Sequence, residues 1–291
     1  MSEWIRPRGT QAGYVTRVMP GDPGWCWTGL EVIDLAPGES RPVDTGGLEY
    51  IVLPLRGGAE VSEAGRTYVL AGRPDVFSGP SDLLYVGRES SFALSSPAGG
   101  RIALASAVAA RSFPTRYLPA EDVPVEIRGA GQATRQVRNF GTPGVLAADS
   151  IIACEVITPA GNWSSYPPHK HDEERPGVET HLEEIYYFEL QTEAGAEAGE
   201  PIGYQRVYGT AERPIEVLAE VRSGDVVLVP HGWHGPAMAP PGYDMYYLNV
   251  MAGPGEERAW LICDDPAHAW VRQTWTAQPV DPRIAPTPSD N

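Results

Sequence analysis

The amino-acid sequence predicts an all-β protein with two β-barrels or sandwiches in one chain and a few short helices. Glycine and proline, 32 and 29 of the 291 residues, divide the chain into many short apolar runs. Short runs of branched and aromatic residues between turn residues are typical of strands. No long stretch keeps a helical period, and the best short helical candidate is 264–270. Many short strands separated by turns favour a sandwich or barrel.

The two halves of the chain resemble each other. The run that begins at Glu49 reads like the run that begins at Glu184, and the run from Asp82 reads like the run from Asp225, at similar offsets. A duplicated domain leaves this kind of repeat. We therefore predict an N-terminal barrel, a linker rich in charge and proline, a C-terminal barrel and a proline-rich extended or disordered tail, at 1–115, 116–140, 141–275 and 276–291.

Composition limits the partners and the compartment. The formal net charge of −16 argues against nucleic acid or an anionic membrane as the principal partner. The three cysteines are scattered and suggest no disulfide framework or thiolate cluster. The N-terminus has no apolar leader region, and no run approaches the length of a membrane span. We expect a soluble cytoplasmic protein.

Three histidines and one glutamate have the spacing of a metal site. His169 and His171 are separated by one residue, so on a strand their side chains point to the same face. Glu184 opens a strand-like aromatic run, and His234 follows an apolar run closed by Pro230 and a glycine. Imidazole and carboxylate suit a divalent cation: we favour Zn or Mn, with Fe, Co or Ni as alternatives. Of the other histidines, we interpret His181 and His231 as non-ligands. His268 is interpreted as a capping, packing or site residue.

This pattern resembles the cupin superfamily. The first cupin motif is matched by Gly161, His169, His171 and Glu184, and the second by Gly224, Pro230, Gly232 and His234. The twelve residues between His171 and Glu184 exceed the usual three or four, and a single residue separates Gly232 from His234 where two are usual. The N-terminal half contains no histidine, so its barrel has no comparable site. Its expected role is packing, shaping the pocket, or an oligomer contact.

These two unusual spacings, together with several longer stretches, resemble the 5-deoxy-glucuronate isomerases, which are the two-barrel cupins (bicupins) of myo-inositol catabolism. They resemble the 4-deoxy-uronate isomerases to a lesser degree. The most specific stretches are 135–140, 158–172, 205–208, 247–253 and 264–270. The resemblance implies a metal-dependent aldose–ketose isomerase that converts 5-deoxy-D-glucuronate to 5-dehydro-2-deoxy-D-gluconate through an enediol. The implied partner is a small sugar acid, and a homo-oligomer is possible.

The residues that move the proton and bind the substrate are less constrained. Tyr186, Tyr246 and Glu173 are candidates for the general base, because a tyrosine or carboxylate beside the metal could accept the proton. Alternation from Glu184 places Tyr186 on the ligand face. Arg206 is the candidate for the substrate carboxylate, since a guanidinium binds a carboxylate through two parallel hydrogen bonds. The spacing of the ligands also fits an Fe-dependent cupin dioxygenase or a non-catalytic sugar-acid-binding cupin, and these alternatives stay open.

Overall fold

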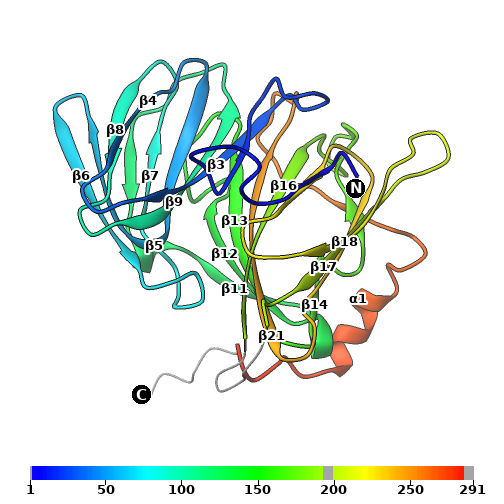
Figure 1. Ribbon diagram of the computed structural model, residues 1–291. Helices are drawn as coiled ribbons and strands as arrows, with labels where there is room; N and C mark the ends of the chain where they lie inside the picture. Colours follow the sequence, from blue (N-terminus) through cyan, green and yellow to red (C-terminus); the bar gives the residue numbers. More distant parts are fainter. Residues whose placement is uncertain (1, 193–198, 285–291) are drawn as a thin grey trace.

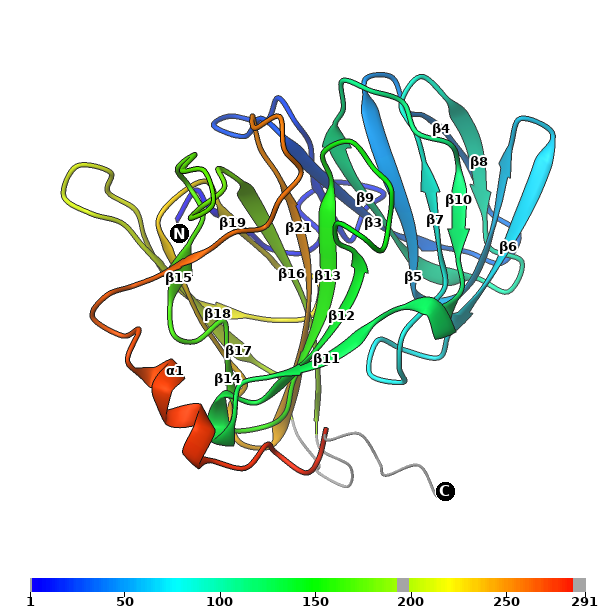
Figure 2. The same cartoon turned by 180° about the vertical axis from the view of Figure 1, so that it is seen from behind.

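The computed structural model describes residues 2–192 and 199–284, which form two β-barrels packed side by side (Figures 1 and 2). The N-terminal barrel is built from one nine-stranded sheet: β2 (Thr16–Val18), β3 (Thr28–Leu35), β4 (Ser40–Asp44), β5 (Leu48–Glu63), β6 (Arg66–Arg73), β7 (Leu83–Val86), β8 (Ser91–Ser95), β9 (Gly100–Val108) and β10 (Arg116–Leu118). The strong bend of this sheet follows from the sixteen-residue β5, which pairs with β7 and β9 in its first half and with β6 and β8 in its second.

The C-terminal barrel consists of two facing sheets. The seven-stranded sheet has the order β1 (Ile5–Arg6), β19 (Val226–Val229), β16 (Glu183–Thr192), β21 (Tyr243–Ala252), β13 (Ile152–Thr158), β12 (Arg135–Gly141) and β11 (Val125–Arg128). The second sheet has the order β18 (Glu216–Val221), β17 (Gly203–Tyr208), β20 (Trp233–Met238), β15 (His169–Lys170) and β22 (Cys263–Asp264), with β14 (Trp163–Ser164) paired to β20. The predicted all-β, cupin-type fold is confirmed.

In residues 2–192 and 199–284, helical structure is limited to short segments. They are η1 (Ala120–Asp122), η2 (Gly131–Ala133), α1 (Val271–Thr274) and η3 (Trp275–Ala277). The helix expected at 264–270 is not formed there: the segment contains the end of β22 and a run of turns, and α1 begins only at Val271. Within the described residues, no helix is long and apolar enough to cross a bilayer.

The strand order supports a duplicated unit. In the N-terminal barrel β7, β5, β9 and β3 are neighbours in that order, and in the C-terminal barrel β19, β16, β21 and β13 are. The repeat is also visible in hydrogen bonds that cross between the barrels. Glu183 at the start of β16 accepts backbone N–H groups of residues 26–28, which lead into β3. Glu49 near the start of β5 accepts those of residues 149–151, just before β13. Glu49 thus corresponds to Glu183, one residue earlier than the sequence comparison suggested, and Tyr50 stands where Glu184 stands in the second barrel.

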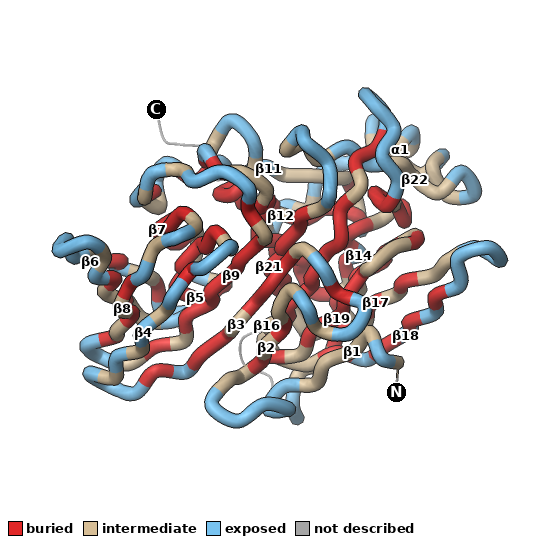
Figure 3. The backbone as a smooth tube through the Cα atoms, turned by 90° about the horizontal axis from the view of Figure 1, so that it is seen from above, coloured by how far each residue is buried: buried red, intermediate tan, exposed pale blue. Residues whose placement is uncertain are grey.

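The two barrels share an apolar core between their sheets. One face of β3, β5, β7 and β9 packs against one face of β13, β16, β19 and β21, through side chains that include Leu53, Tyr85, Tyr187, Leu228 and Leu248. Most residues of the central strands β3, β16 and β21 are buried, as the view from above in Figure 3 shows. Alternate residues of β16 and β21, among them Tyr186, Phe188 and Tyr247, face the interior of the C-terminal barrel instead. The N-terminal barrel therefore supports the sheet that carries the site.

The structure differs from the predicted division of the chain in three places. The segment 116–140 is not a linker: its first strand, β10, pairs with β7 of the N-terminal barrel, while β11 and β12 belong to the C-terminal sheet. The first strand of the chain, β1, also joins the C-terminal sheet. In the tail, Pro279 accepts the N–H of Gly131, Asp281 accepts from the Asn162 side chain, and the Asp281 N–H donates to the Thr134 hydroxyl, so this part of the tail is anchored to the C-terminal barrel. Residues 285–291 of the predicted tail lie outside the described residues.

Candidate metal centre and pocket

The four predicted metal ligands meet inside the C-terminal barrel. His169 on β15 lies directly opposite His234 on β20 in the antiparallel ladder. Glu184 comes from β16 in the facing sheet, and His171 follows β15. All four side chains are buried. The alternation of strand side chains and the closure of the two sheets bring residues far apart in sequence to one point.

The imidazoles are oriented for binding through Nε2. The ring of His234 lies between the other two, with its centroid 4.5 Å from that of His169 and 4.6 Å from that of His171. Each Nδ1 faces a backbone carbonyl: Pro167 at 3.4 Å for His169, Leu182 at 3.1 Å for His171 and Gly232 at 3.2 Å for His234. Carbonyls at Nδ1 fix the tautomer and leave Nε2 as the coordinating atom.

The donor atoms fit a divalent cation. The Nε2 atoms of His171 and His234 each lie 3.1 Å from Oε2 of Glu184, and donor atoms of these three residues all lie within 4.8 Å of one another. Nε2 of His234 is buried, and its contact with Glu184 is not aligned as a hydrogen bond. A buried nitrogen without a well-aligned partner is costly, and a cation would satisfy it. His169 is not part of this tightest group but joins it through its contact with the His234 ring.

Electrostatics agree with ligation. Burial raises the pKa of Glu184, but His171 and His234 lower it by more, so the pKa is about 2. The carboxylate is therefore ionised at neutral pH. Burial and the neighbouring imidazoles hold the pKa of His169 well below its usual value, which keeps its lone pair free. Burial lowers the pKa of His171 while Glu184 raises it above its ordinary value, and a metal would displace that proton.

Glycine and aspartate shape the turn that carries His234. Oδ2 of Asp172 accepts the N–H of Gly232 at 2.9 Å, and Asp172 is itself paired with Lys170 at 2.6 Å. Gly235 has a φ of +98°, and a Cβ there would lie 1.8 Å from the carbonyl oxygen of Ser165. Only glycine fits this close approach. The turn thereby brings the Ser165 backbone next to the ligand strand.

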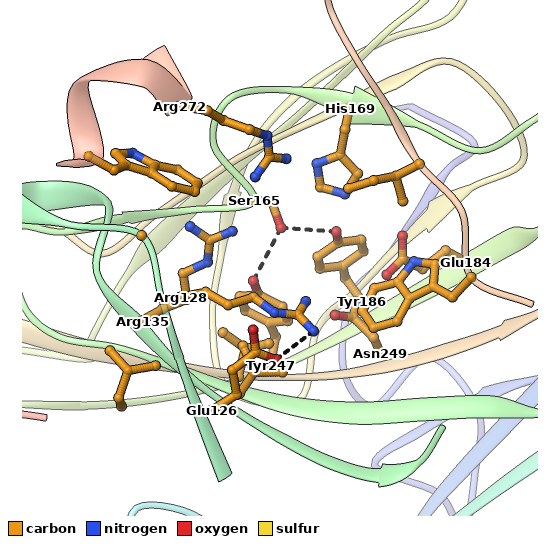
Figure 4. Close-up of a pocket in the computed structure, with 17 residues that line it drawn as sticks. Glu126, Arg128, Arg135, Ser165, His169, Glu184, Tyr186, Tyr247, Asn249 and Arg272 are labelled. Atoms are coloured by element: carbon orange, nitrogen blue, oxygen red, sulfur yellow. Dashed lines mark hydrogen bonds and ion pairs between the residues drawn. The ribbon is translucent and has the colours of Figure 1, made fainter. Parts of the chain in front are cut away.

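A pocket of about 450 Å³ opens from the metal cluster (Figure 4). Its lining residues come from the C-terminal barrel and the segment around α1, and none comes from residues 1–115. His169 and Glu184 line one side, and Arg135 lies on the opposite side in Figure 4. The N-terminal barrel supports the sheet below the pocket without lining it.

Hydroxyl groups lie between these two sides. The Ser165 hydroxyl is 3.1 Å from the hydroxyls of both Tyr186 and Tyr247, and all three side chains line the pocket (Figure 4). Burial, with Glu184 nearby, raises the pKa of Tyr186 well above its ordinary value. Ser165 and Tyr247 did not stand out in the sequence. Tyr247 follows Tyr246 in a strand buried on both faces, so alternation alone did not fix which of the two faces the metal.

Of the three candidates for the base, the structure brings one to the pocket. Tyr186 lines it, as the alternation from Glu184 predicted. Tyr246 points the other way, and its hydroxyl donates to Glu155 at 2.7 Å in the region between the barrels. Glu173 lies at the surface, 3.3 Å from Lys170. The interpretations of Tyr246 and Glu173 as residues beside the metal are therefore wrong.

The predicted substrate arginine is also misplaced. The guanidinium of Arg206 lies 4.3 Å from the centre of the Tyr208 ring, and Arg206 does not line the pocket. Arg206 and Tyr208 face away because β17 contributes its other face, with Gln205 and Val207, to the barrel interior. Three other arginines line the pocket instead: Arg128, Arg135 and Arg272.

Comparison with known proteins shows that the chain is similar to proteins named 5-deoxy-glucuronate isomerase. A sequence model of the KduI/IolB family matches residues 4–271. The 5-deoxy-glucuronate isomerase of Geobacillus kaustophilus is 41% identical over 266 residues, which is 91% of this chain and 92% of that protein. The protein of the same name from Bacillus subtilis strain 168 is 38% identical over 244 residues, covering 83% of this chain and 86% of that protein.

Solved structures agree with the sequence relatives. An IolB-like protein from Salmonella typhimurium LT2 superposes with a TM-score of 0.84 at 32% identity, covering 93% of this chain and 99% of that one. An oxalate decarboxylase from Lactobacillus farciminis superposes with a TM-score of 0.59 at 13% identity, and the match covers 85% of this chain and 82% of that one. It is similar in fold alone. The predicted resemblance and the predicted class of enzyme, an isomerase, are confirmed. The chain belongs to the KduI/IolB family.

Proposed function

We propose that the chain is a metal-dependent aldose–ketose isomerase that interconverts 5-deoxy-D-glucuronate and 5-dehydro-2-deoxy-D-gluconate, as the resemblance to enzymes of myo-inositol catabolism implies. One observation carries the proposal: a buried His–Glu cluster opens into the same pocket as hydroxyl groups and cationic side chains. The substrate has an aldehyde at one end and a carboxylate at the other, and the pocket offers a counterpart for each.

The reaction moves hydrogen between neighbouring carbons without net oxidation. The C2–H bond breaks and a C1–H bond forms, the C2 hydroxyl loses its proton, and the former aldehyde oxygen gains one. The substrate has no C5 hydroxyl and so cannot close a pyranose ring, which leaves the aldehyde accessible without a ring-opening step of that kind. The protein must hold the two reacting carbons next to a group that accepts and returns a proton.

The cluster of His169, His171, Glu184 and His234 would hold the cation. When bound, a divalent cation supplies a positive charge that polarises the aldehyde oxygen and the neighbouring hydroxyl. Glu184 contributes one negative charge, and the neutral imidazoles contribute none. The site as a whole therefore stays positive, which suits the negative charge that develops on the substrate oxygens.

The hydroxyl groups of Tyr186, Ser165 and Tyr247 form the proton-handling part of the pocket in this proposal. Tyr186 lies beside the cluster, with its ring centroid 6.1 Å from that of His234. The Ser165 hydroxyl connects it to Tyr247 through contacts of 3.1 Å. A connected set of hydroxyls can accept a proton at one oxygen and donate one at another.

The proposal is tested by incubating the metal-loaded protein with 5-deoxy-D-glucuronate in deuterated water and following the product by NMR. We expect conversion to the ketose, with solvent deuterium at the former aldehyde carbon. Conversion without deuterium would contradict the enediol route. Absence of conversion with Zn, Mn, Fe, Co and Ni in turn would contradict the isomerase.

The same experiment separates the two rival functions. An Fe-dependent dioxygenase would consume oxygen with the sugar acid, whereas the isomerase turns over under nitrogen. A binding protein would show metal-dependent affinity without exchange of substrate hydrogen. His171→Ala should abolish metal retention and turnover together, and His268→Ala, a substitution of the same kind outside the pocket lining, is the matched control.

A further inference from the structure

Arg135 is an unusual side chain because it is buried and cationic without an acidic partner. It is 6% exposed, and its guanidinium Nη1 donates to the backbone carbonyl of Ala133 at 3.0 Å. No carboxylate within the described part of the chain forms an ion pair with it. A buried guanidinium is normally paired, so an unpaired one facing a pocket indicates a missing anion.

The two neighbouring arginines are already neutralised. Arg128 forms an ion pair with Glu126 at 2.9 Å. Arg272 donates through Nε and Nη2 to the two carboxylate oxygens of Asp264. This side of the pocket therefore carries one uncompensated positive charge, that of Arg135. One charge matches a single carboxylate, whereas a phosphate dianion would leave one negative charge unpaired.

Aromatic rings hold these guanidinium groups in place. Arg135 and Arg272 lie over the ring of Trp275, with distances of 5.5 and 5.1 Å to its centre, and Arg128 lies 5.2 Å from that of Trp260. These contacts restrict the guanidinium groups, and the N–H groups of Arg135 that do not bind Ala133 remain available for an anion. Burial, with Arg128 and Arg272 nearby, lowers the pKa of Arg135 to about 10, so it remains protonated at neutral pH.

We infer that Arg135 binds the carboxylate at the far end of the substrate and selects sugar acids over neutral sugars. The inference rests on the proposed function and assigns the substrate an orientation: aldehyde toward Glu184 and His169, carboxylate toward Arg135 (Figure 4). Ser165 lies between these two sides of the pocket. Arg135, on β12, thus replaces Arg206, the residue suggested by the sequence, as the arginine that binds the carboxylate.

The test compares Arg135→Met with Arg206→Met, two substitutions of the same kind inside and outside the pocket. Each is assayed with 5-deoxy-D-glucuronate and with its neutral analogue, in which a hydroxymethyl group replaces the carboxylate. Loss of a hydrogen-bonded charge pair should raise KM for the acid about 100-fold in Arg135→Met. The neutral analogue should be converted equally by both variants and the unmodified protein. Arg135→Lys should recover part of the affinity, because it keeps the charge but not the planar fork.

A binding experiment keeps this inference separate from the proposed function. D-Gluconate has the carboxylate and hydroxyls of a six-carbon sugar acid but no aldehyde, so its binding to the metal-free protein is measured by calorimetry. We expect binding by the unmodified protein and Arg206→Met and none by Arg135→Met. If the unmodified protein converts no substrate but Arg135→Met alone loses gluconate, the proposed function fails and the carboxylate site stands.

Three outcomes would overturn the inference. They are acid preference retained by Arg135→Met, an equal loss toward acid and neutral analogue, and no gluconate binding by the unmodified protein. Thermal unfolding of each variant checks the fold. Removing an unpaired buried charge should not destabilise the barrel, so a folded Arg135→Met protein is expected.

Discussion

Replacing Arg73 by methionine tests whether a buried ion pair stabilises the contact between the barrels. Arg73 ends β6 in the N-terminal barrel, and Glu155 lies on β13 in the C-terminal barrel. Their side chains are 3% and 1% exposed, and they are joined by a short contact and by a second hydrogen bond of 3.2 Å. Glu155 also accepts from Tyr246 at 2.7 Å and lies 3.7 Å from Arg138.

The expected cost follows from what the substitution leaves behind. Breaking a buried ion pair by removing one partner typically costs about 3–5 kcal/mol, because the other charge stays buried. Since Arg138 and Tyr246 still contact Glu155, we expect the lower end, about 3 kcal/mol. With an unfolding entropy of about 2.1 cal/mol/K per residue over a chain of this length, that corresponds to a midpoint lowered by about 5 °C.

Urea and thermal unfolding followed by circular dichroism measure this change. Arg56→Met is the matched control, because Arg56 is an exposed arginine 3.7 Å from Asp34 and exposed pairs contribute little. Glu155→Gln and the double variant complete a cycle, in which we expect a coupling energy of about 2 kcal/mol or more between Arg73 and Glu155. A loss below about 1 kcal/mol in Arg73→Met, or a coupling near zero, would refute the reasoning.

Four further outcomes follow. Ser165→Ala should lower kcat about tenfold with unchanged metal content, because two hydroxyl contacts are lost, and an unaltered kcat would remove Ser165 from the reaction. Tyr246→Phe should lower the free energy of unfolding by about 1.5–3 kcal/mol and leave turnover intact, whereas a large loss of turnover would return its phenol to the site. Glu173→Gln should change neither kinetic constant, and a measurable effect on kcat would contradict its surface placement. Burial raises the pKa of Glu155, but Arg73 lowers it by more, so the pKa lies below its ordinary value. The ionised Glu155 therefore adds to the free energy of unfolding above about pH 4.3, and this contribution is lost as the pH falls through the folded-state pKa. Glu155→Gln should flatten the dependence of stability on pH in this range, and an identical dependence in that variant would exclude Glu155 as its source.

The fold and the metal cluster could be predicted because each leaves a local pattern. His169 and His171 share a face by strand alternation, and Tyr186 was assigned correctly to the side of Glu184 by the same rule. The duplication was visible as well, although one residue out of register. Such patterns depend on neighbours in the chain and not on the partner across the sheet.

The errors arose where both faces of a strand are buried. In β21, Tyr246 and Tyr247 are equally buried, one in the core between the barrels and one in the barrel interior. A strand covered on both sides shows no alternation of apolar and polar residues, so its phase cannot be read from the sequence.

Charge was the second source of error. The segment that contains β12 was predicted to be a linker because it is rich in charge and proline, and its charged residues include several arginines. Two of these are buried: Arg138 lies near Glu155 and donates to the Val76 carbonyl, and Arg135 faces the pocket. Charged residues indicate a solvated segment only when no partner from elsewhere in the chain, or from a ligand, is available to them.

The most direct test of the central claim is a crystal structure of the metal-loaded protein with anomalous diffraction measured at the absorption edge of the ion. The account predicts one anomalous peak about 2.0–2.2 Å from Nε2 of His169, His171 and His234 and from a carboxylate oxygen of Glu184. A peak elsewhere, or a loaded protein with no peak among these four side chains, would contradict it.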